Sequence, residues 1–227
     1  MDNQEHKLVR SFGRIKTRKL SDKKEDLMAD LYPKFEIDSS KNHKIEDYQD
    51  FSKKSFEIGF GFGDFMAQKA KDSPNQLFFG AEPHINGVVN VVSKIEEFDI
   101  KNIRISMEDA RILLESFEDG FFDEFYILFA DPWPKVKHFK RRIITAKFLD
   151  EVVAKKLKKG MVLTIATDHD SYKTWICAEI LKSEKFSWKC KSKEDWKKFP
   201  KDWVESKYQK KALREGRESV IFTLHRI

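Results

Sequence analysis

The sequence predicts a doubly wound α/β domain in which helices cover both faces of a mostly parallel sheet. Three observations support this fold. Short apolar stretches alternate with amphipathic helical patterns, a glycine-rich turn joins a strand to a helix, and later strands end in acidic residues. Because hydrophobic residues make up 40% of the 227-residue chain, we expect one domain with a sizeable core and a short N-terminal extension.

The first 50 residues are expected to form a basic arm, a short helix and a linker, ahead of the main domain at residues 51–227. The arm is either a solvated tail or a segment that follows phosphates. Ser21 is expected to cap a helix that runs to Leu31. Residues 36–50 have no clear hydrophobic period and are expected to be the linker. The cations of the arm are Lys7, Arg10, Arg14, Lys16, Arg18 and Lys19.

A glycine-rich turn follows the first strand of the main domain. Gly59, Gly61 and Gly63 stand at alternate positions, as in a tight turn that needs positive φ and close approach of a ligand. The spacing differs from the G-x-G-x-x-G of dinucleotide sites, and the carboxylates of Glu57 and Asp64 would repel a pyrophosphate. They suit a ligand with cationic groups, such as the sulfonium and amino group of S-adenosylmethionine. The alternative is a purely structural corner between strand and helix.

The next two strands also lead to acidic residues. Residues 76–80 form a strand that ends at Glu82, about 20 positions after the glycines, where a ribose diol is commonly held. Residues 102–107 alternate like a third strand, and Asp109 then opens a helix. Asp109 is expected both to cap this helix and to accept a hydrogen bond from an adenine amino group. The helix between these strands has the apolar residues Ile85, Val88, Val89, Val92 and Ile95 at helical spacing.

Residues 121–130 are almost continuously apolar, as is typical of a central parallel strand. Prolines on both sides of Trp133 then restrict the backbone and hold Asp131 at the carboxyl end of the strand, where ligands of open α/β sheets bind. The alternative is a proline-rich turn with a packed tryptophan. Residues 137–142 concentrate positive charge and are expected to contact phosphates, against the alternative of a solvated charge run.

The remaining pattern completes the alternation of helices and strands. Residues 149–157 mark an amphipathic helix, which we expect Lys158 to Gly160 to close as a C-cap. A fifth strand at residues 161–166 leads to Asp168, and the neighbouring His169 is expected to be a surface or capping residue. The last expected elements are a helix with Tyr172, Trp175, Ile176 and Ile180 inward, a strand at residues 186–191 and a closing strand at residues 219–224.

Charge and composition limit the partners. A net charge of +6 and a pI of about 9.1 favour an anionic partner. Cys177 and Cys190 form no metal-type or redox-type pair, which is typical of a reduced compartment. Without an apolar stretch long enough for a signal peptide or a membrane span, the protein is expected to be cytoplasmic, with no metal, no membrane and no obligate protein partner.

Four segments together resemble the bacterial tRNA (guanine-N7)-methyltransferases. They are residues 57–64, 131–135, 166–168 and 206–217, and the similarity extends from Arg10 to the C-terminus. The resemblance implies a Rossmann-like class I methyltransferase, with a seven-stranded sheet whose last strand is antiparallel. It also implies methyl transfer from S-adenosylmethionine to N7 of a guanine in the tRNA variable loop (position 46 in standard tRNA numbering).

The resemblance assigns roles to individual residues. Asp131 matches the proposed catalytic position. The cofactor positions are Glu57, Gly59, Gly61, Gly63, Glu82, Asp109, Ala110 and Asp131. The substrate positions are Lys135, Asp168, Ser206, Lys207, Tyr208 and Gln209, and the RNA-contacting loop is Lys137, His138, Phe139, Lys140, Arg141 and Arg142.

The chain departs from the family pattern at several positions. Ser206 stands where threonine is usual and keeps the hydroxyl, whereas Gln209 replaces a glutamate and can donate as well as accept. Pro83 replaces an apolar residue, and His169 replaces an aromatic one, which would weaken a packing contact.

Guanine N7 has a lone pair and no proton, so methylation at this atom needs orientation rather than a general base. Asp131 is expected to hold donors on the Watson–Crick edge and to stabilise the positive charge that develops on the ring, a role Asp168 could share. Trp133 would stack on the base or brace its loop. The alternatives are an S-adenosylmethionine enzyme that acts on an exocyclic amine or a protein, and a tRNA-binding protein without catalysis.

Overall fold

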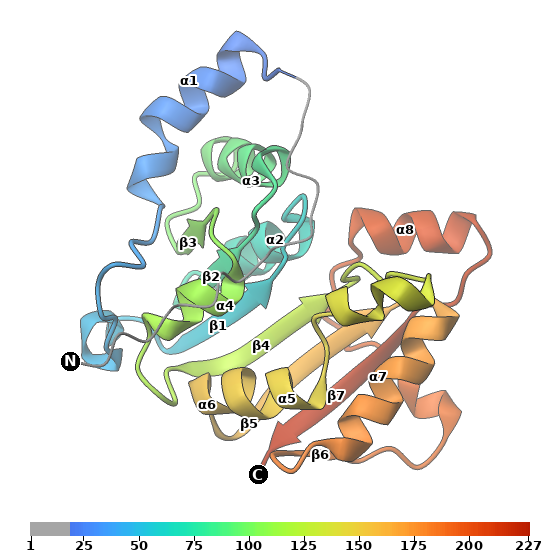
Figure 1. Ribbon diagram of the computed structural model, residues 1–227. Coiled ribbons are helices and arrows are strands. Elements are labelled where there is room, and N and C mark those ends of the chain that lie inside the picture. The colour runs from blue at the N-terminus through green and yellow to red at the C-terminus, as the bar shows by residue number, and fades with distance from the viewer. Residues whose placement is uncertain (1–18) are drawn as a thin grey trace.

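Seven strands form one sheet in the order β3-β2-β1-β4-β5-β7-β6 (Figure 1). Strands β1 to β5 pair in parallel, and β7 pairs antiparallel with both β5 and β6, which confirms the predicted sheet. The strand order reverses between β1 and β4, where ligands of such sheets bind. The strands are β1 Lys53–Ile58, β2 Gln76–Ala81, β3 Ile103–Ser106, β4 Phe122–Leu128, β5 Leu157–Thr167, β6 Phe186–Trp188 and β7 Val220–Arg226.

This computed structural model describes residues 19–227, so the predicted basic arm lies outside the described residues except for Lys19 and Leu20. Ser21 occupies the N-cap position of α1, although its side chain makes no capping hydrogen bond. The helices are α1 Asp22–Asp30, α2 Asp64–Asp72, α3 Ile85–Glu97, α4 Ala110–Glu115, α5 Ala146–Phe148, α6 Ala154–Lys156, α7 Asp170–Lys182 and α8 Lys207–Arg214.

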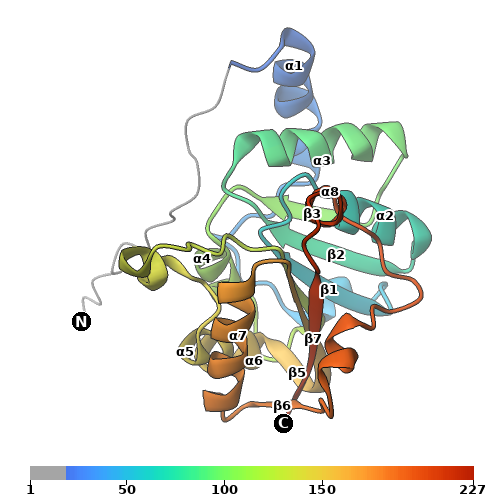
Figure 2. The same ribbon diagram turned by 90° about the vertical axis from the view of Figure 1, so that its right-hand side faces the viewer.

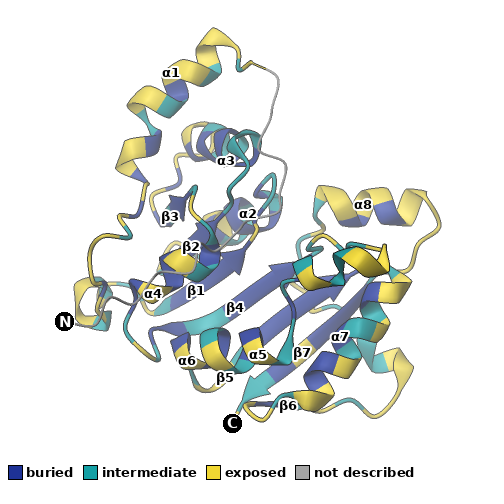
Figure 3. Ribbon diagram, viewed as in Figure 1, coloured by how far each residue is buried: buried dark blue, intermediate teal, exposed yellow. Residues whose placement is uncertain are grey.

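The helices divide between the two faces of the sheet (Figure 2). Apolar residues of α1, α2 and α3 share one buried cluster, and those of α4, α5, α6 and α7 share another. The stripe predicted on α3 is confirmed, because Val88, Val89, Val92 and Ile95 are all buried. Figure 3 shows that the central strands between these layers are mostly buried. The strand ends are therefore the parts of the sheet left for a ligand.

A cluster of phenylalanine rings fills the core between the sheet and α4. Phe56, Phe79, Phe117, Phe121 and Phe122 are each no more than 1% exposed. Neighbouring rings meet edge to face at centroid distances such as 5.2 Å for Phe56 and Phe122 and 4.7 Å for Phe121 and Phe122. Each pair of this kind stabilises the fold by about 0.5–1.5 kcal/mol beyond the contribution of the apolar area that it buries. This packing anchors β1 and β4, the two strands that lead to the glycine turn and to Asp131.

The segment expected to be a linker is packed onto the domain instead. The backbone amide of Ile37 donates to the Ile105 carbonyl at 2.9 Å, and that of Ile105 donates to the Phe35 carbonyl at 2.9 Å, so the segment covers the free edge of β3. Ile37 is buried, and the Tyr48 ring lies 5.4 Å from that of Phe79. The apolar residues are too widely spaced to produce a periodic pattern. A domain boundary at residue 50 stays a prediction.

The predicted C-cap at Lys158 to Gly160 is wrong, because these residues lie within β5. The preceding helix is continuous from α5 through a π-helical turn at Leu149–Val153 into α6. Leu157 is fully buried, and Lys158 donates to Asp123 at 2.7 Å, so tertiary contacts begin the strand early. The pairing with β4 shifts register there, and Gly160 has φ +78°. β6 is also shorter than the predicted strand at residues 186–191.

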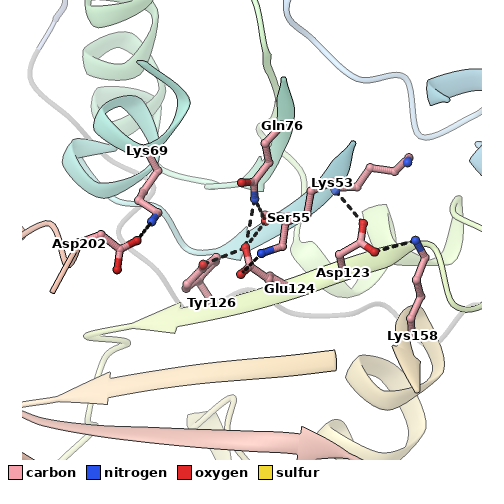
Figure 4. A network of polar contacts seen from close by, with 10 residues as sticks. Lys53, Ser55, Lys69, Gln76, Asp123, Glu124, Tyr126, Lys158 and Asp202 are labelled. Carbon is pink, nitrogen blue, oxygen red and sulfur yellow. Dashed lines mark hydrogen bonds and ion pairs between the residues drawn. The ribbon is translucent and has the colours of Figure 1, made fainter. Parts of the chain in front are cut away.

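A polar network joins β1, β2 and β4 near their amino ends (Figure 4). The Glu124 carboxylate accepts hydrogen bonds from Ser55 Oγ at 2.8 Å, from Gln76 Nε2 at 3.1 Å and from the Tyr126 hydroxyl at 3.0 Å. Lys53 forms an ion pair with it. Burial alone would raise the pKa of Glu124, but the hydrogen bonds from Lys53 and Ser55 outweigh burial and hold it below its usual value. This end of the sheet is therefore fully engaged in structural contacts.

Candidate functional site

The glycine turn bends the chain from β1 into α2 with positive φ at each glycine. The φ values of Gly59, Gly61 and Gly63 are 69°, 53° and 66°. A Cβ at Gly63 would lie 2.0 Å from Val91 Cγ2, and one at Gly61 would lie 3.1 Å from the Tyr208 ring. Side chains at these positions would strain the backbone, and the one at Gly63 would also clash with α3. The turn therefore requires the glycines that the sequence places there.

A small cavity lies against this turn, and Glu57 is on its wall. Glu57 is only 5% exposed, and its Oε2 has no hydrogen-bond partner among residues 19–227. Burial raises the pKa of Glu57 to about 8, and the charges of Glu82 and Asp64 add to the effect. A buried carboxylate without a partner is costly unless a ligand supplies a donor or a cation. The other residues lining the cavity are Gly59, Phe60, Phe62, Gly63, Asp64, Phe65, Leu128, Ser206 and Tyr208.

Glu82 holds the glycine turn against the end of β2. Its Oε2 accepts from the backbone amide of Gly61 and its Oε1 from that of His84, both at 2.9 Å. Burial raises the pKa of Glu82, although these two hydrogen bonds oppose the rise. Because each carboxylate oxygen has two lone pairs, Glu82 can still accept from a further donor. Its position at the rim of the turn is the one predicted.

Asp64 begins α2 beside the cavity and is held by two elements. Lys94 of α3 forms an ion pair with Asp64 and donates to the Phe62 carbonyl at 2.9 Å. The backbone amide of Lys207 donates to Asp64 Oδ2 at 3.3 Å. The sequence analysis did not predict a role for Lys94. The one indication in the sequence is a positive charge within a helix that is otherwise mostly apolar.

The predicted cap by Asp109 is confirmed. Its Oδ1 accepts from the backbone amide of Arg111 at 2.9 Å, and its Oδ2 pairs with the Arg111 guanidinium at 2.7 Å. Ala110 is buried next to it. Because β3 is parallel to β1 and β2, this cap lies at the same edge of the sheet as Glu82 and the glycine turn.

Asp131 is exposed at the carboxyl end of β4, in a loop with an unusual backbone. Phe129 and Trp133 have φ values of 55° and 43°, a region that bulky residues rarely adopt and that is enriched at functional sites. The Trp133 ring meets His138 edge to face at 5.8 Å and lies 4.8 Å from the Arg141 guanidinium. Trp133 therefore braces the loop. Stacking on a base stays a prediction.

Tyr208 of α8 lies within the electrostatic influence of three acidic groups. Burial raises this pKa, and the charges of Glu82, Asp131 and Asp64 add to the rise in that order. The Tyr208 ring thus lies among acidic groups contributed by the ends of β1, β2 and β4.

The basic loop separates into an outward and an inward side. Lys135, Lys137 and Lys140 are exposed, whereas Phe139 packs 5.5 Å from the Trp175 ring. Arg142 is only 4% exposed, which does not favour RNA contact, so its assignment to the RNA-contacting loop stays a prediction. A run of charges in sequence does not show which side chains turn inward.

His138 lies in the same loop and faces Trp133. Desolvation lowers the pKa of His138, and the positive charges of Arg141 and Lys137 lower it further. His138 is therefore neutral near pH 7 and does not add to the charge of the loop.

The segment before α8 is anchored to α2. The Trp203 ring packs 5.2 Å from that of Phe65, and Asp202 pairs with Lys69 at 2.5 Å. Trp203 Nε1 also donates to Gln209 Oε1 at 2.7 Å. Because Gln209 acts here as an acceptor, a glutamate would make the same hydrogen bond. These contacts place the start of α8 against the cavity.

The start of α8 covers the glycine turn. Ser206 Oγ accepts from the backbone amide of Gln209 at 3.2 Å and caps the helix. The Lys207 ammonium lies 4.4 Å from the centre of the Phe62 ring, and the centre of the Tyr208 ring lies 6.3 Å from that of Phe62. The predicted substrate residues Ser206 to Tyr208 are thus next to the glycine turn, where the cofactor is predicted to bind.

Asp168 lies at the end of β5 and pairs with Arg217, whose Nε is 2.7 Å from its Oδ2. Arg217 precedes β7, which starts opposite Thr167 at the same edge of the sheet. The sequence reading gave Arg217 no role, although it belongs to the segment 206–217 that carried the family resemblance. His169 takes the N-cap position of α7 without capping through its side chain.

A larger groove lies between α1 and α3, but none of the predicted site residues lines it. We therefore assign the candidate site to the smaller cavity, which five of the predicted residues line: Glu57, Gly59, Gly63, Ser206 and Tyr208. No group of three or more metal-ligating side chains occurs within residues 19–227. Over the same range, no helix is long and apolar enough to cross a membrane.

Comparison with known proteins identifies the family of the chain. Residues 52–222 match a family model described as a putative methyltransferase. A tRNA (guanine-N(7)-)-methyltransferase of Zymomonas mobilis is 35% identical over 96% of this chain and 94% of its own length. Enzymes of the same name from Caulobacter vibrioides and Rhizobium johnstonii are 34% and 33% identical, over 92% and 95% of this chain and 92% and 94% of their own lengths.

Solved structures support the fold. An antibiotic-related methyltransferase aligns with a TM-score of 0.56 at 18% identity, covering 94% of this chain and 98% of its own. The 16S rRNA methyltransferase KamB aligns with a TM-score of 0.57 at 14% identity, covering 80% of this chain and 91% of its own.

Proposed function

This chain belongs to the tRNA (guanine-N7)-methyltransferase family, and from that membership we propose that it methylates N7 of a guanine in the variable loop of tRNA, with S-adenosylmethionine as methyl donor. The reaction takes place at the carboxyl edge of the sheet, between the glycine turn and the Asp131 loop. The described residues supply the chemistry that this reaction needs.

The observation that carries the proposal is the unpartnered Oε2 of Glu57 in the cavity at the glycine turn. A carboxylate there suits the cationic amino group of S-adenosylmethionine. Glu82 has spare acceptor capacity for ribose hydroxyls, and Asp109 is an acceptor at the same edge. These carboxylates, which accept hydrogen bonds and carry negative charge, fit this cofactor better than they fit a pyrophosphate. When bound, S-adenosylmethionine supplies a methyl group made electrophilic by its sulfonium.

Asp131 is the catalytic residue in this proposal. Its carboxylate accepts hydrogen bonds from the N–H groups on the Watson–Crick edge of the guanine, and it stabilises the positive charge that the ring acquires. N7 has no proton to remove, so a general base is not needed. The braced loop holds Asp131 in place before the substrate arrives, which lowers the entropic cost of orientation.

The tRNA backbone is held by exposed cations that follow Asp131 along the chain. Lys135, Lys137 and Lys140 are free to reach phosphates beside the target base. Asp168, oriented by Arg217, and the start of α8 line the other side of the base. Arg142 has no part in phosphate binding because it is buried.

The test is methylation of an unmodified tRNA transcript with labelled S-adenosylmethionine, followed by mapping of the labelled base. The expected product is 7-methylguanosine in the variable loop, absent when that guanosine is replaced by adenosine. A label on an exocyclic amine would assign the chain to another reaction. Binding of tRNA without any label would support the non-catalytic alternative.

A further inference from the structure

Arg142 lies at the end of the basic loop but is turned away from solvent. It is 4% exposed, whereas Lys137 and Lys140 of the same loop are exposed. An arginine is almost never buried unless its donors are used. Its contacts therefore show what it does.

Two of its donors join the loop after β4 to the helix after β5. Arg142 Nε donates to the Pro132 carbonyl at 2.8 Å, and its Nη2 donates to Ser171 Oγ at 3.3 Å. Pro132 directly follows Asp131, and Ser171 lies in the first turn of α7, three residues after Asp168. One guanidinium thus connects the segments that present the two carboxylates of the substrate site.

Aromatic rings surround the rest of the guanidinium. Its carbon is 3.8 Å from the Phe139 ring, 5.0 Å from the Trp175 ring and 5.2 Å from the Tyr172 ring. A planar guanidinium can contact these rings and still direct its N–H groups toward two acceptors. The ammonium of lysine is a compact charge on a flexible stem and cannot do both.

The Asp131 loop depends on such an external donor. Pro132 and Pro134 have no backbone N–H, so the loop supplies few donors of its own. The Pro132 carbonyl accepts its hydrogen bond from another segment of the chain, through Arg142. Moving this carbonyl would move the backbone that carries Asp131.

We propose that Arg142 is a positioning residue, which fixes the Asp131 loop relative to Asp168 by binding the Pro132 carbonyl and Ser171. It touches neither tRNA nor cofactor. This inference rests on the proposed function, because it concerns the geometry of the same carboxylates. A displacement of about 1 Å at a reacting group lowers a rate by up to about 10²-fold.

The test uses Arg142→Lys, which keeps the charge and loses the planar fork. Arg104→Lys is the matched control, because Arg104 also donates to backbone carbonyls, at 3.1 Å to Lys101 and 2.6 Å to Ile103, but lies on β3. For Arg142→Lys we expect kcat to fall about 10- to 10²-fold, with KM for tRNA and the salt dependence of tRNA binding unchanged. Amide hydrogen exchange of the segment from Phe129 to His138 is expected to accelerate. Arg104→Lys is expected to change neither kcat nor exchange.

Two results would overturn the proposal. An unchanged kcat with unchanged exchange in folded Arg142→Lys would show that the contacts do not position the loop. A normal kcat with weaker tRNA binding, and with the slope of log K against log salt reduced by about 0.7, would show a phosphate contact instead.

A second variant applies if Arg142→Lys does not fold. Ser171→Ala removes one contact of Arg142 and is expected to lower kcat by about two- to fivefold. An unchanged kcat in Ser171→Ala would equally contradict the proposal. Should the wild type not methylate tRNA, the proposed function fails, while the exchange comparison still decides whether Arg142 holds the loop.

Discussion

Glu57 and Glu124 lie on the same face of the neighbouring strands β1 and β4, yet their environments are opposite. Glu124 faces Ser55 across the two strands, and Glu57 lies two residues further along β1, opposite Tyr126. Glu124 has partners from three strands, and its pKa is held below the usual value, with burial opposing this (Figure 4). Glu57 has an unpartnered oxygen, and burial raises its pKa to about 8.

The difference shows how this sheet divides stability from function. Groups near the amino ends satisfy one another and hold the strands together. At the carboxyl ends, a buried acceptor is left for a ligand, which costs stability in the free protein. Binding of the ligand then offsets this cost.

Asp131→Ala is expected to lower methyl transfer by about 10²–10³ without lowering the melting temperature, because an exposed group that stabilises developing charge is lost. Asp123→Ala, at the other end of the same strand, is the matched control. It removes acceptors for the Lys54 amide and Lys158, so it is expected to lower the melting temperature and leave kcat unchanged. Single-turnover assays and thermal unfolding measure both. Near-normal turnover in Asp131→Ala would contradict the assignment.

Glu57→Gln is expected to weaken binding of S-adenosylmethionine by about 10- to 10²-fold, the scale of a charge-assisted hydrogen bond. The free protein is expected to become more stable above neutral pH, since a buried charge is removed. Glu124→Gln is expected to leave cofactor affinity unchanged and to make the free protein less stable. Titration calorimetry and thermal unfolding of both variants check the pair. Equal cofactor affinity in wild type and Glu57→Gln would mean that the glycine turn is only a structural corner.

The raised pKa of Glu57 predicts a pH dependence. In the folded protein Glu57 keeps its proton up to about pH 8, whereas the unfolded chain loses it near the ordinary glutamate pKa of 4.5. Its contribution therefore makes the free protein less stable as pH rises through this window, by at most about 1.4 kcal/mol per pH unit. Cofactor affinity is expected to rise by up to about tenfold per pH unit toward pH 8, and to lose this dependence in Glu57→Gln. A pH-independent affinity in the wild type would contradict the role of Glu57.

A double substitution of Lys137 and Lys140 by alanine is expected to weaken tRNA binding and to leave cofactor affinity unchanged. Each lost phosphate contact on single-strand-like RNA reduces the slope of log K against log salt by about 0.7, so the two together reduce it by about 1.4. Binding measured over a salt series for wild type and variant checks this. Parallel lines would show that these lysines are only a solvated face of the loop.

Sequence patterns alone predict the α/β alternation, the glycine turn and the order in which acidic residues reach one edge of the sheet. These features are local or periodic: an apolar stripe defines the buried face of α3, and only glycine suits the φ of 66° at Gly63 beside Val91. Because parallel strands bring their carboxyl ends together, the positions of Glu57, Glu82, Asp109, Asp131 and Asp168 followed from the strand pattern.

The sequence pattern does not show which charged groups find partners on distant segments. Arg142 and Lys140 look alike in the sequence, but only Arg142 meets the Pro132 carbonyl and a ring of aromatic residues. Glu124 gains partners from β1 and β2, and Asp168 gains Arg217 from a segment 49 residues away. The physical reason is the same in each case. A hydrogen bond depends on distance and direction in space, whereas periodicity records only which side of an element is buried.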